Sequence, residues 1–383
     1  MILRKDVSYY ETGDKLLVNF ICCYLVIQAI HNLIVTVGIN GMWWTVLSRG
    51  IVAAFLAFAL IPIVIRQGIK AVAIELVVAI LLAASYLFAS TNSEFPSIAF
   101  NLIFAYVPMG IACLSIHDDS LLLKRLYVVA WLVEIVTFAN AVNRLTLSYS
   151  MSLGYLLLLP ALIHFDRFLE NRKWLDLLMV GIDAMMIIFF ASRGPIICVT
   201  FYFLLKVLFS SNMSPRKKAG LIVIALTLVS IVYFSIDRIT IFLAELFSRY
   251  GGISRTLKLL SSGTIGYDAN RNSIFDHYWD LINEAPIVGH GLAGSWDVSS
   301  YPHNIVIELF LAFGIPIGVV LISLLLFVTI KGISQRNLER MRLSQIFVAQ
   351  LISLLWSGSF IMTPTFFVAI AICVKGVQAK VKV

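Results

Sequence analysis

Charged side chains are scarce in this sequence. Only 13% of its 383 residues are Asp, Glu, Lys or Arg, whereas 60% are hydrophobic and the mean hydropathy is +0.94. An ordinary soluble domain has about 25% charged and about 45–50% apolar residues. The composition therefore excludes a soluble enzyme. Many apolar runs can cross a hydrocarbon core of about 30 Å as helices, which predicts an all-α polytopic membrane protein and excludes an outer-membrane barrel.

No cysteine lies in a loop between the apolar segments, where a disulfide or a metal site would need it. The five cysteines all lie inside apolar segments, so neither a disulfide framework nor a Cys-x-x-Cys metal site is predicted. None of the other five histidines lies at a metal-ligand spacing from His303, so we infer no histidine metal site either. The five cysteines are Cys22, Cys23, Cys113, Cys198 and Cys373.

About twelve transmembrane helices are expected from the apolar runs. There is no internal repeat and no linker, so residues 1–383 are expected to form a single integral membrane domain. The expected spans are 16–37, 43–64, 71–90, 97–116, 121–143, 147–165, 174–190, 195–210, 219–235, 304–330, 341–357 and 363–377.

The basic residues predict how these helices are oriented. The formal net charge is +8, but Lys and Arg occur in short clusters between apolar runs, which is typical of membrane loops rather than of nucleic-acid binding. If both termini are cytoplasmic, 20 of the 29 Lys and Arg residues lie inside and 7 lie outside. By the positive-inside rule, this bias orients the chain with the segment 236–302 outside.

The segment 236–302 is the only sizeable hydrophilic part of the chain, with 67 residues. Functional residues concentrate in such loops because a rigid scaffold can hold them. Apolar residues from Ile274 to Ile282 recur at helical spacing, and Pro286 ends the run. We therefore expect an amphipathic helix over 272–285 that rests on the bundle or on the membrane interface.

Two arginines are candidates for binding an anion. Arg193 lies in Ser192-Arg193-Gly194-Pro195, where Ser192 suits an N-cap and Pro195 suits a first helical turn. The helix dipole opposes a cation at that position unless an anion is shared. Arg271 repeats the arrangement at the start of the amphipathic helix. Because Arg grips phosphate bidentately, the pair predicts a pyrophosphate clamp; the alternative for Arg193 is an interfacial arginine that extends to the headgroups.

Two further arginines are weaker candidates for substrate binding. Arg255 is equally compatible with a solvated loop face. Arg49 lies about two turns inside the second expected helix, where a charge is costly in lipid, and we expect it to face a cavity.

His303 is a candidate base. It follows Pro302 at the outer start of the tenth expected helix, where the positive end of the dipole favours neutral imidazole. Asn304 follows directly, and Glu308 lies about one turn into the membrane. A buried Glu needs a partner, and we expect one of the arginines. The alternative for His303 is a residue that only caps the helix.

Other polar residues and glycines inside the spans have less specific interpretations. Glu75, Glu134 and Asp183 are compatible with a polar path, as in a transporter, and equally with packed hydrogen-bonding residues. Gly314 and Gly318 flank a proline, which permits close helix approach and a bend, so packing is their predicted role.

In their order along the chain, these motifs resemble the O-antigen polymerase and O-antigen ligase family of bacterial envelope glycosyltransferases. In the family an Arg opens a helix that ends in Pro-x-x-Gly-x-Gly, and a His-Asn pair is followed by Gly. The resemblance covers roughly residues 180–330, and this chain departs from the family's usual Gly-x-x-Gly with Gly-Ile-Pro-Ile-Gly at 314–318. The matching residues are Ser192-Arg193-Gly194-Pro195, Arg271, Trp279, Pro286, Gly289, His290, Gly291, Tyr301-Pro302-His303-Asn304, Glu308 and Gly314.

The resemblance implies a multi-span, GT-C-like glycosyltransferase of the bacterial inner membrane, with 236–302 as a large periplasmic loop and the active site facing the periplasm. Its donor would be an oligosaccharide linked to undecaprenyl pyrophosphate. Because pyrophosphate is a stable leaving group, the reaction needs charge stabilisation and a base, without a metal or other cofactor. Arg193 and Arg271 would hold the pyrophosphate, and His303 would act on the acceptor hydroxyl. Glu308 would support them, and a single displacement would invert the anomeric centre. The expected substrate-binding residues are Arg49, Arg255, Asn304 and Glu308.

Polymerase and ligase differ in the acceptor, which is a second lipid-linked repeat unit or the sugar of a lipid A core. One external loop with short turns elsewhere leaves little surface for a lipid A core, so polymerase is favoured and ligase is the alternative. A lipid-linked sugar transporter or flippase is the alternative from another class, although the internal repeats expected of one are not found. The expected partners are the lipid-linked oligosaccharide, the bilayer and a chain-length regulator protein, with no nucleic acid.

Overall fold

A computed structural model describes residues 2–37, 41–89, 94–143, 151–190, 194–209, 214–224, 271–293 and 301–381, together with isolated positions between 226 and 238. Within these residues the regular structure is helical, and no strand occurs among them. Six helices or runs of consecutive helices are long and apolar enough to cross a membrane, and two shorter apolar helices accompany them. The prediction of an all-α membrane protein is confirmed. The six spans are Tyr10–Val35, Trp43–Gln67, Ile69–Leu87, Phe95–Ser115, Ser152–Asn171 and Ile305–Ile333.

The chain divides into two compact units, which are described separately. Unit 1 comprises Met1–Tyr24, Leu47–Arg125 and Asp268–Val383, and unit 2 comprises Leu25–Val46 and Leu126–Tyr267. Three helices pass from one unit to the other, which agrees with the absence of a linker in the sequence. These helices are α1 (Ile2–Val37), α2 (Gly41–Gln67) and α6 (Asp119–Asn143).

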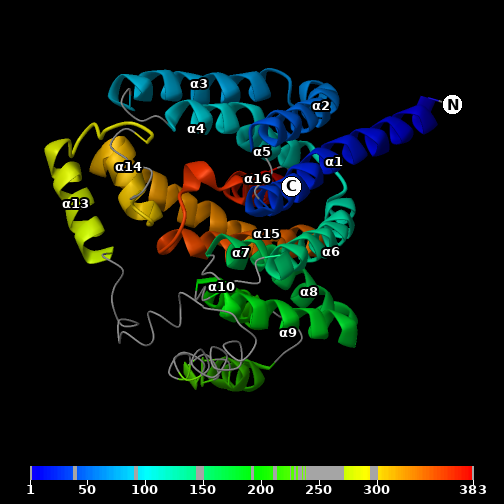
Figure 1. Ribbon diagram of the computed structural model, residues 1–383. Coiled ribbons are helices and arrows are strands. Elements are labelled where there is room, and N and C mark those ends of the chain that lie inside the picture. Colours follow the sequence, from blue (N-terminus) through cyan, green and yellow to red (C-terminus); the bar gives the residue numbers. More distant parts are fainter. Residues whose placement is uncertain are drawn as a thin grey trace. The chain divides into compact units, whose positions relative to one another are not determined.

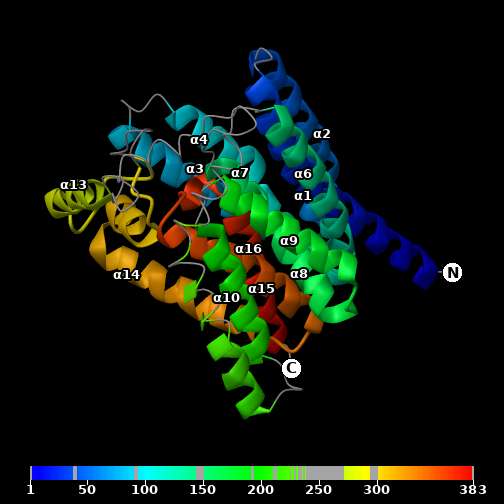
Figure 2. The same ribbon diagram turned by 60° about the horizontal axis from the view of Figure 1, so that its bottom comes forward.

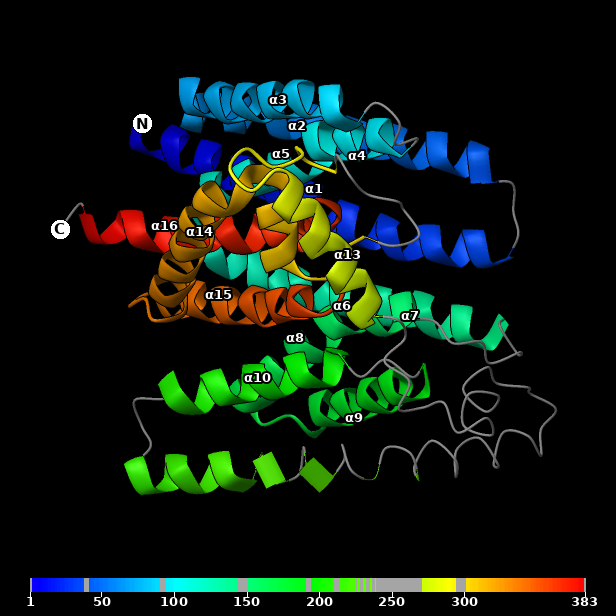
Figure 3. The ribbon, with the colours of Figure 1, turned by 90° about the vertical axis from the view of Figure 1, so that its left-hand side faces the viewer.

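Unit 1 contains the remaining N-terminal helices and all C-terminal ones (Figures 1 and 3). After α3, the helices α4 and α5 are joined without a break by a π-helical turn, η1. The elements are α3 (Ile69–Ala89), α4 (Phe95–Asn101), η1 (Leu102–Tyr106), α5 (Val107–Ser115), α13 (Arg271–Glu284), α14 (Ile305–Ile333), α15 (Leu338–Leu351), the short 3-10 helices η3 (Ile352–Leu355) and η4 (Phe360–Met362), and α16 (Pro364–Val381).

The core of unit 1 surrounds α16, which packs against α5, α14 and α15. Val368, Ala369 and Cys373 of α16 are fully buried. α15 is less apolar, and two of the polar side chains that it buries, Ser344 and Gln345, have hydrogen-bond partners at the end of α14 and just after it. Gln335 Nε2 donates to Ser344 Oγ at 2.7 Å, and Gln345 Nε2 donates to the Ile333 carbonyl at 3.3 Å. These hydrogen bonds offset the cost of placing amides in an apolar interior.

α14 is broken at Gly314, whose φ of 74° and ψ of 166° are not helical. The sequence permitted such a bend, although packing was the role predicted for Gly314 and Gly318. Pro316 follows two residues later and cannot donate a backbone hydrogen bond to the preceding turn.

Unit 2 contains four further named helices and the later part of α6. α8 packs against α9 and α10, and Figure 2 shows these three side by side. Leu153, Leu157, Ile187 and Phe190 form a buried apolar cluster. Residues 215–224 are also helical. The named helices are α7 (Met151–Leu156), α8 (Leu158–Asn171), α9 (Trp174–Phe189) and α10 (Gly194–Phe209).

Candidate functional site

Of the arginines predicted to bind an anion, the structure describes only the backbone of Arg271. Arg193 and Arg255 lie outside the described residues. Arg271 is the first residue of α13, which confirms the prediction that this arginine begins a helix, although its side chain lies outside the described part. A ligand at Arg271 would therefore meet the positive end of the α13 dipole and its free backbone N–H groups.

The amphipathic helix expected over 272–285 is found as α13, which packs against α14. Tyr278 and Ile282 on its inner face are 1% and 0% exposed. The Trp279 ring lies 6.2 Å from that of Phe310 on α14. Burial of this apolar face holds α13 on the bundle.

The segment after α13 docks on the break in α14. His290 N donates to the Leu311 carbonyl at 2.7 Å, Gly291 N donates to the Ala312 carbonyl at 3.0 Å, and Ile315 N donates to the Pro286 carbonyl at 2.8 Å. The break frees backbone groups that would be costly to leave unpaired in an apolar setting. Residues 286–291 supply their partners, so the Pro-x-x-Gly-x-Gly motif belongs to the architecture that supports the site.

His303 lies in a backbone turn just before α14. Its φ is 54°, in the left-handed region, and its ring centroid lies 3.8 Å from that of Tyr301. Such a conformation is uncommon for a residue with a side chain and is found most often at functional sites.

Asn304 is the N-cap of α14. Its Oδ1 accepts from Val306 N at 2.9 Å and from Ile307 N at 3.3 Å, and its Nδ2 donates to the Leu355 carbonyl at 2.8 Å. Asn304 was predicted to bind substrate, and these contacts leave at most the second amide N–H for that purpose. The cap is Asn304 itself, so a capping role does not account for His303.

Glu308 is buried, with 3% of its surface exposed. Its carboxylate accepts from Ser359 Oγ and from Phe360 N, the latter at 3.1 Å. Both donors belong to the segment between α15 and α16. Glu308 thus positions that segment. The side chains of Arg193, Arg255 and Arg271 lie outside the described residues, so the expected arginine partner stays a prediction.

Tyr301 completes this polar cluster. Burial raises the pKa of the Tyr301 hydroxyl, a hydrogen bond with the Gly358 backbone opposes the increase, and the nearby Glu308 charge adds to it. Gly358 has a φ of 84°. The start of α14 and the irregular segment 356–363 therefore hold Tyr301, Glu308 and Ser359 together at one end of unit 1. Irregular backbone and buried polar groups at the end of a membrane helix are typical of a functional site.

Arg49 is placed differently from the prediction. Its side chain is exposed, with Nη2 3.4 Å from Ser97 Oγ and the guanidinium 4.9 Å from the centroid of the Phe100 ring on α4. The described residues therefore form no enclosed cavity around Arg49. Its long side chain reaches the start of α4, where a cation–π contact and a hydroxyl receive it.

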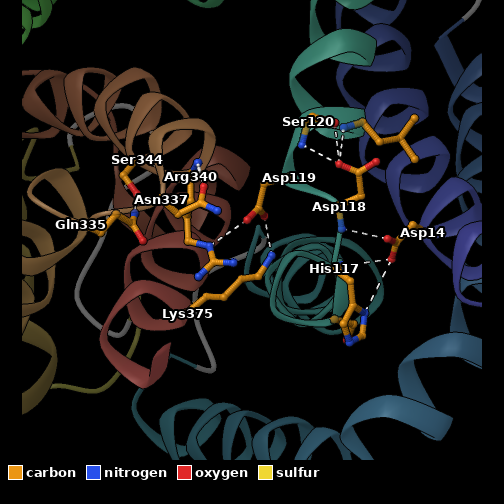
Figure 4. A network of polar contacts seen from close by, with 12 residues as sticks. Asp14, His117, Asp118, Asp119, Ser120, Gln335, Asn337, Arg340, Ser344 and Lys375 are labelled. Atoms are coloured by element: carbon orange, nitrogen blue, oxygen red, sulfur yellow. Dashed lines mark hydrogen bonds and ion pairs between the residues drawn. The ribbon is translucent and has the colours of Figure 1, made fainter. Parts of the chain in front are cut away.

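The opposite end of unit 1 carries a network of ion pairs that the sequence did not predict (Figure 4). Asp119 binds Arg340, at 2.8 Å, and Lys375. Asp14 binds Arg66 and accepts from the backbone N–H groups of His117 and Asp118 at 3.1 and 2.9 Å. The contacts join ends of α1, α2, α5, α6, α15 and α16, all of which were predicted to lie on one side of the membrane.

Two titratable groups outside the spans have shifted pKa values at this end. Asp118 caps the start of α6, because its carboxylate accepts hydrogen bonds from the N–H and the hydroxyl of Ser120. These hydrogen bonds hold the pKa of Asp118 below its usual value. Burial and, secondarily, the Arg66 charge lower the pKa of His117, while Asp14 opposes the decrease.

Unit 2 contains a second group of buried ionisable residues. His164 of α8 lies between two carboxylates, with Nδ1 2.9 Å from Asp176 Oδ1 and Nε2 3.1 Å from Glu134 Oε1. Glu134 is the charged group that interacts with Asp183, which is itself fully buried. Glu134 and Asp183 were recognised in the sequence as acids within spans. Their association with His164 and Asp176 was not, because helix pairing cannot be read from isolated acids on separate helices.

A neighbouring ion pair joins α8 and α10. Lys206 Nζ lies 2.6 Å from Asp166 Oδ1 and 3.6 Å from Glu170 Oε1, and the Tyr202 hydroxyl donates to Asp166 at 2.5 Å. Lys206, a cation within an expected span, therefore has partners inside the protein, and this arrangement reads as structural.

Comparisons with family models, with curated proteins and with solved structures find no match to this chain. The class that the fold and the site define is a polytopic all-α membrane protein with a polar site at one end of its C-terminal helices.

Proposed function

We propose that this chain is an O-antigen (surface polysaccharide) polymerase of the bacterial inner membrane. It would join repeat units carried on undecaprenyl pyrophosphate by inverting glycosyl transfer at the periplasmic face. The proposal includes about twelve membrane helices in a GT-C-like architecture and a periplasmic loop over 236–302.

The observation that carries the proposal is the group of residues that lie together around His303 at one end of unit 1. The strained turn at His303, the Tyr301 ring, the buried Glu308 and the segment 356–363 lie together, and α13, which begins at Arg271, packs on the same helix, α14. Apart from Ser192-Arg193-Gly194-Pro195, the motifs on which the resemblance to the polymerase and ligase family rests lie in unit 1, in or next to α13 and α14.

The chemistry proposed for these residues is charge stabilisation combined with proton acceptance. Arg271 and Arg193 would stabilise the departing pyrophosphate, and His303 would accept the proton of the attacking hydroxyl. Glu308 acts by positioning segment 356–363, and Asn304 acts by fixing the start of α14. Attack by the acceptor hydroxyl on the anomeric carbon expels the pyrophosphate with its electron pair, which inverts that centre.

Deletion of the gene tests the function directly. Loss of a polymerase should leave lipid A core capped by a single repeat unit, seen as one short band on a lipopolysaccharide gel, because ligation still proceeds. Bare core with long polymer retained on undecaprenyl pyrophosphate would identify the ligase instead. Restoration by the wild-type gene but not by His303→Ala would assign His303 to the reaction; His277→Ala, an exposed histidine on α13, is the matched control.

A transporter of lipid-linked sugars is the second candidate, and the buried ionisable group in unit 2 favours it. Charged residues inside membrane helices often mark transport pathways. Deletion of such a transporter would trap single repeat units on the cytoplasmic leaflet, whereas deletion of a polymerase leaves them accessible to a periplasmic glycosidase added to spheroplasts.

A further inference from the structure

The buried group in unit 2 comprises Glu134 of α6, His164 and Arg167 of α8, and Asp176 and Asp183 of α9. Glu134, His164 and Asp183 are 0% exposed and Asp176 is 1% exposed. Arg167, with 27% of its side chain exposed, is the member nearest the surface; its Nε lies 3.7 Å from Asp176 Oδ2. The proposed polymerase chemistry uses none of these residues.

The helices α7 and α10, which pack on α8 and α9, bring no further charge to this group in the described residues. On α6, the Tyr127 ring lies 3.5 Å from the Arg167 guanidinium and 5.3 Å from the His164 ring. On α10, Lys206 and Tyr202 are engaged with Asp166 on α8. α7 contributes Tyr155 as its one titratable residue.

The charges of this group do not balance when all its members are ionised. Three carboxylates would face the Arg167 guanidinium and a protonated His164, which leaves one buried negative charge without a partner. An uncompensated charge in such surroundings is strongly destabilising. One additional proton on the acids makes the group neutral.

The geometry indicates where that proton lies. His164 and Arg167 contact Asp176, so Asp176 has cationic partners. Both oxygens of the fully buried Asp183 lack a donor among the described residues, although the Glu134 carboxyl is within reach. Two ionised carboxylates cannot form a hydrogen bond with each other, because neither has a proton to donate. A protonated carboxylic acid can donate to a carboxylate, and close acid pairs therefore hold one proton between them.

We propose that unit 2 contains a proton-binding site in which Glu134 and Asp183 share one proton and His164 carries a second. His164 lies between Asp176 and Glu134, and Glu134 interacts with Asp183, so the two protons belong to one group. The group extends from the start of α9 to Asp183, seven residues and about 10 Å further along the helix. The ligand is the proton itself. This site is independent of the proposed glycosyl transfer.

Infrared difference spectroscopy of the purified protein at neutral pH tests this site. The wild-type minus Asp183→Asn spectrum should contain the C=O stretch of a protonated carboxylic acid, and the band should shift in D₂O. The wild-type minus Glu134→Gln spectrum should contain the same band, because either substitution removes the acid pair. Glu170→Gln, a carboxyl on α8 that is 35% exposed, is the control and should leave the region unchanged.

The absence of the band from both difference spectra would show that both acids are ionised and would overturn the proposal. A band lost in only one variant would show that the proton belongs to a single acid, and a band seen only after sodium ions are removed would assign the site to a metal cation. Either result overturns the shared proton. If one variant fails to fold, the other still provides the difference spectrum.

Stability provides a second measurement. Each single amide variant keeps the group neutral and retains an N–H donor for the remaining carboxylate, so its Tm should stay close to that of the wild type. The double variant, Glu134→Gln with Asp183→Asn, carries one excess positive charge. Its Tm should therefore increase with pH as His164 loses its proton, and equal losses of Tm in single and double variants would contradict the charge balance.

Discussion

The backbone of Gly314 occupies the space that a side chain on Gly289 would need. A Cβ on Gly289 would lie 2.5 Å from Gly314 N, and a Cβ on Gly314 would overlap the Ile287 carbonyl. Both residues have left-handed backbone, with φ values of 72° and 74°. Backbone thus packs directly on backbone where the segment after α13 meets the break in α14, and this contact holds the amphipathic helix against the C-terminal helices.

Replacing either glycine by alanine should destabilise this junction. Each substitution forces a side chain into left-handed backbone and against a carbonyl or amide that cannot move alone, and we expect a loss of about 2 kcal/mol or more. Thermal unfolding in detergent measures the change. Gly50→Ala is the control, because nothing lies within 4 Å of its Cβ position and it is in a helix, where alanine stabilises. A Gly314→Ala variant as stable as the control would contradict the packing.

Arg193→Ala and Arg271→Ala should each abolish polysaccharide polymerisation while folded protein is retained. Loss of a charged hydrogen bond to phosphate costs a few kcal/mol, about 10²-fold or more in rate. Lys should substitute poorly because bidentate geometry is lost. Gel analysis of glycan chain length in a complemented deletion strain gives the readout. Arg336→Ala, an exposed arginine after α14, should leave the chains unchanged, and near-normal chains in either site variant would remove that arginine from the site.

Asp119→Asn should strongly destabilise unit 1. Asp119 is the shared partner of Arg340 and Lys375, whose side chains are 14% and 13% exposed, and its loss leaves two poorly solvated cations. Breaking a buried pair costs about 3–5 kcal/mol, whereas an exposed pair contributes about 0–1 kcal/mol. Glu11→Gln removes such an exposed pair with Lys15 and is the control for thermal unfolding. Similar losses in the two variants would show that the Asp119 network contributes little.

Acidification should weaken the fold through His117. Because folding lowers its pKa, the unfolded chain binds a proton more readily than the folded protein. The stabilisation from neutral His117 is therefore fully present above the unfolded pKa of about 6.5 and is lost as the pH falls through the lower folded pKa. His117→Gln should flatten the Tm-against-pH profile in this window. An unchanged slope would show that His117 does not contribute.

Cysteine labelling tests the predicted orientation. Val288 is 71% exposed in the segment that docks on the break in α14, and Arg336 is exposed just after the other end of α14. In intact spheroplasts, an impermeant maleimide should label Val288→Cys but not Arg336→Cys. The reverse pattern would invert the topology. The cysteines of the protein itself are buried or half-buried, which limits background labelling.

Much of the fold could be predicted because it depends on local patterns. The apolar runs predicted an all-α membrane protein, the helical spacing of Ile274 to Ile282 predicted α13, and Gly314 with Pro316 permitted the bend in α14. Each of these features follows from residues adjacent in sequence, since helix formation and helix breaking depend on near neighbours.

The side-chain partners could not be predicted in this way. Nothing in the sequence around Glu308 indicated that Ser359 and Phe360, about fifty residues later, donate to its carboxylate.

By itself, the sequence determined that the chain is helical and enters a membrane and that a bend at Gly314 is permitted, because hydropathy and backbone preference are properties of short segments. Only the tertiary structure decided that Asn304 is the N-cap and that Arg49 lies exposed against α4. It alone brought Glu134, His164, Asp176 and Asp183 together from three helices. The reason is physical: a buried polar group binds whatever donor or acceptor the packing of distant helices brings within reach, and that packing is not encoded in the spacing along any one helix.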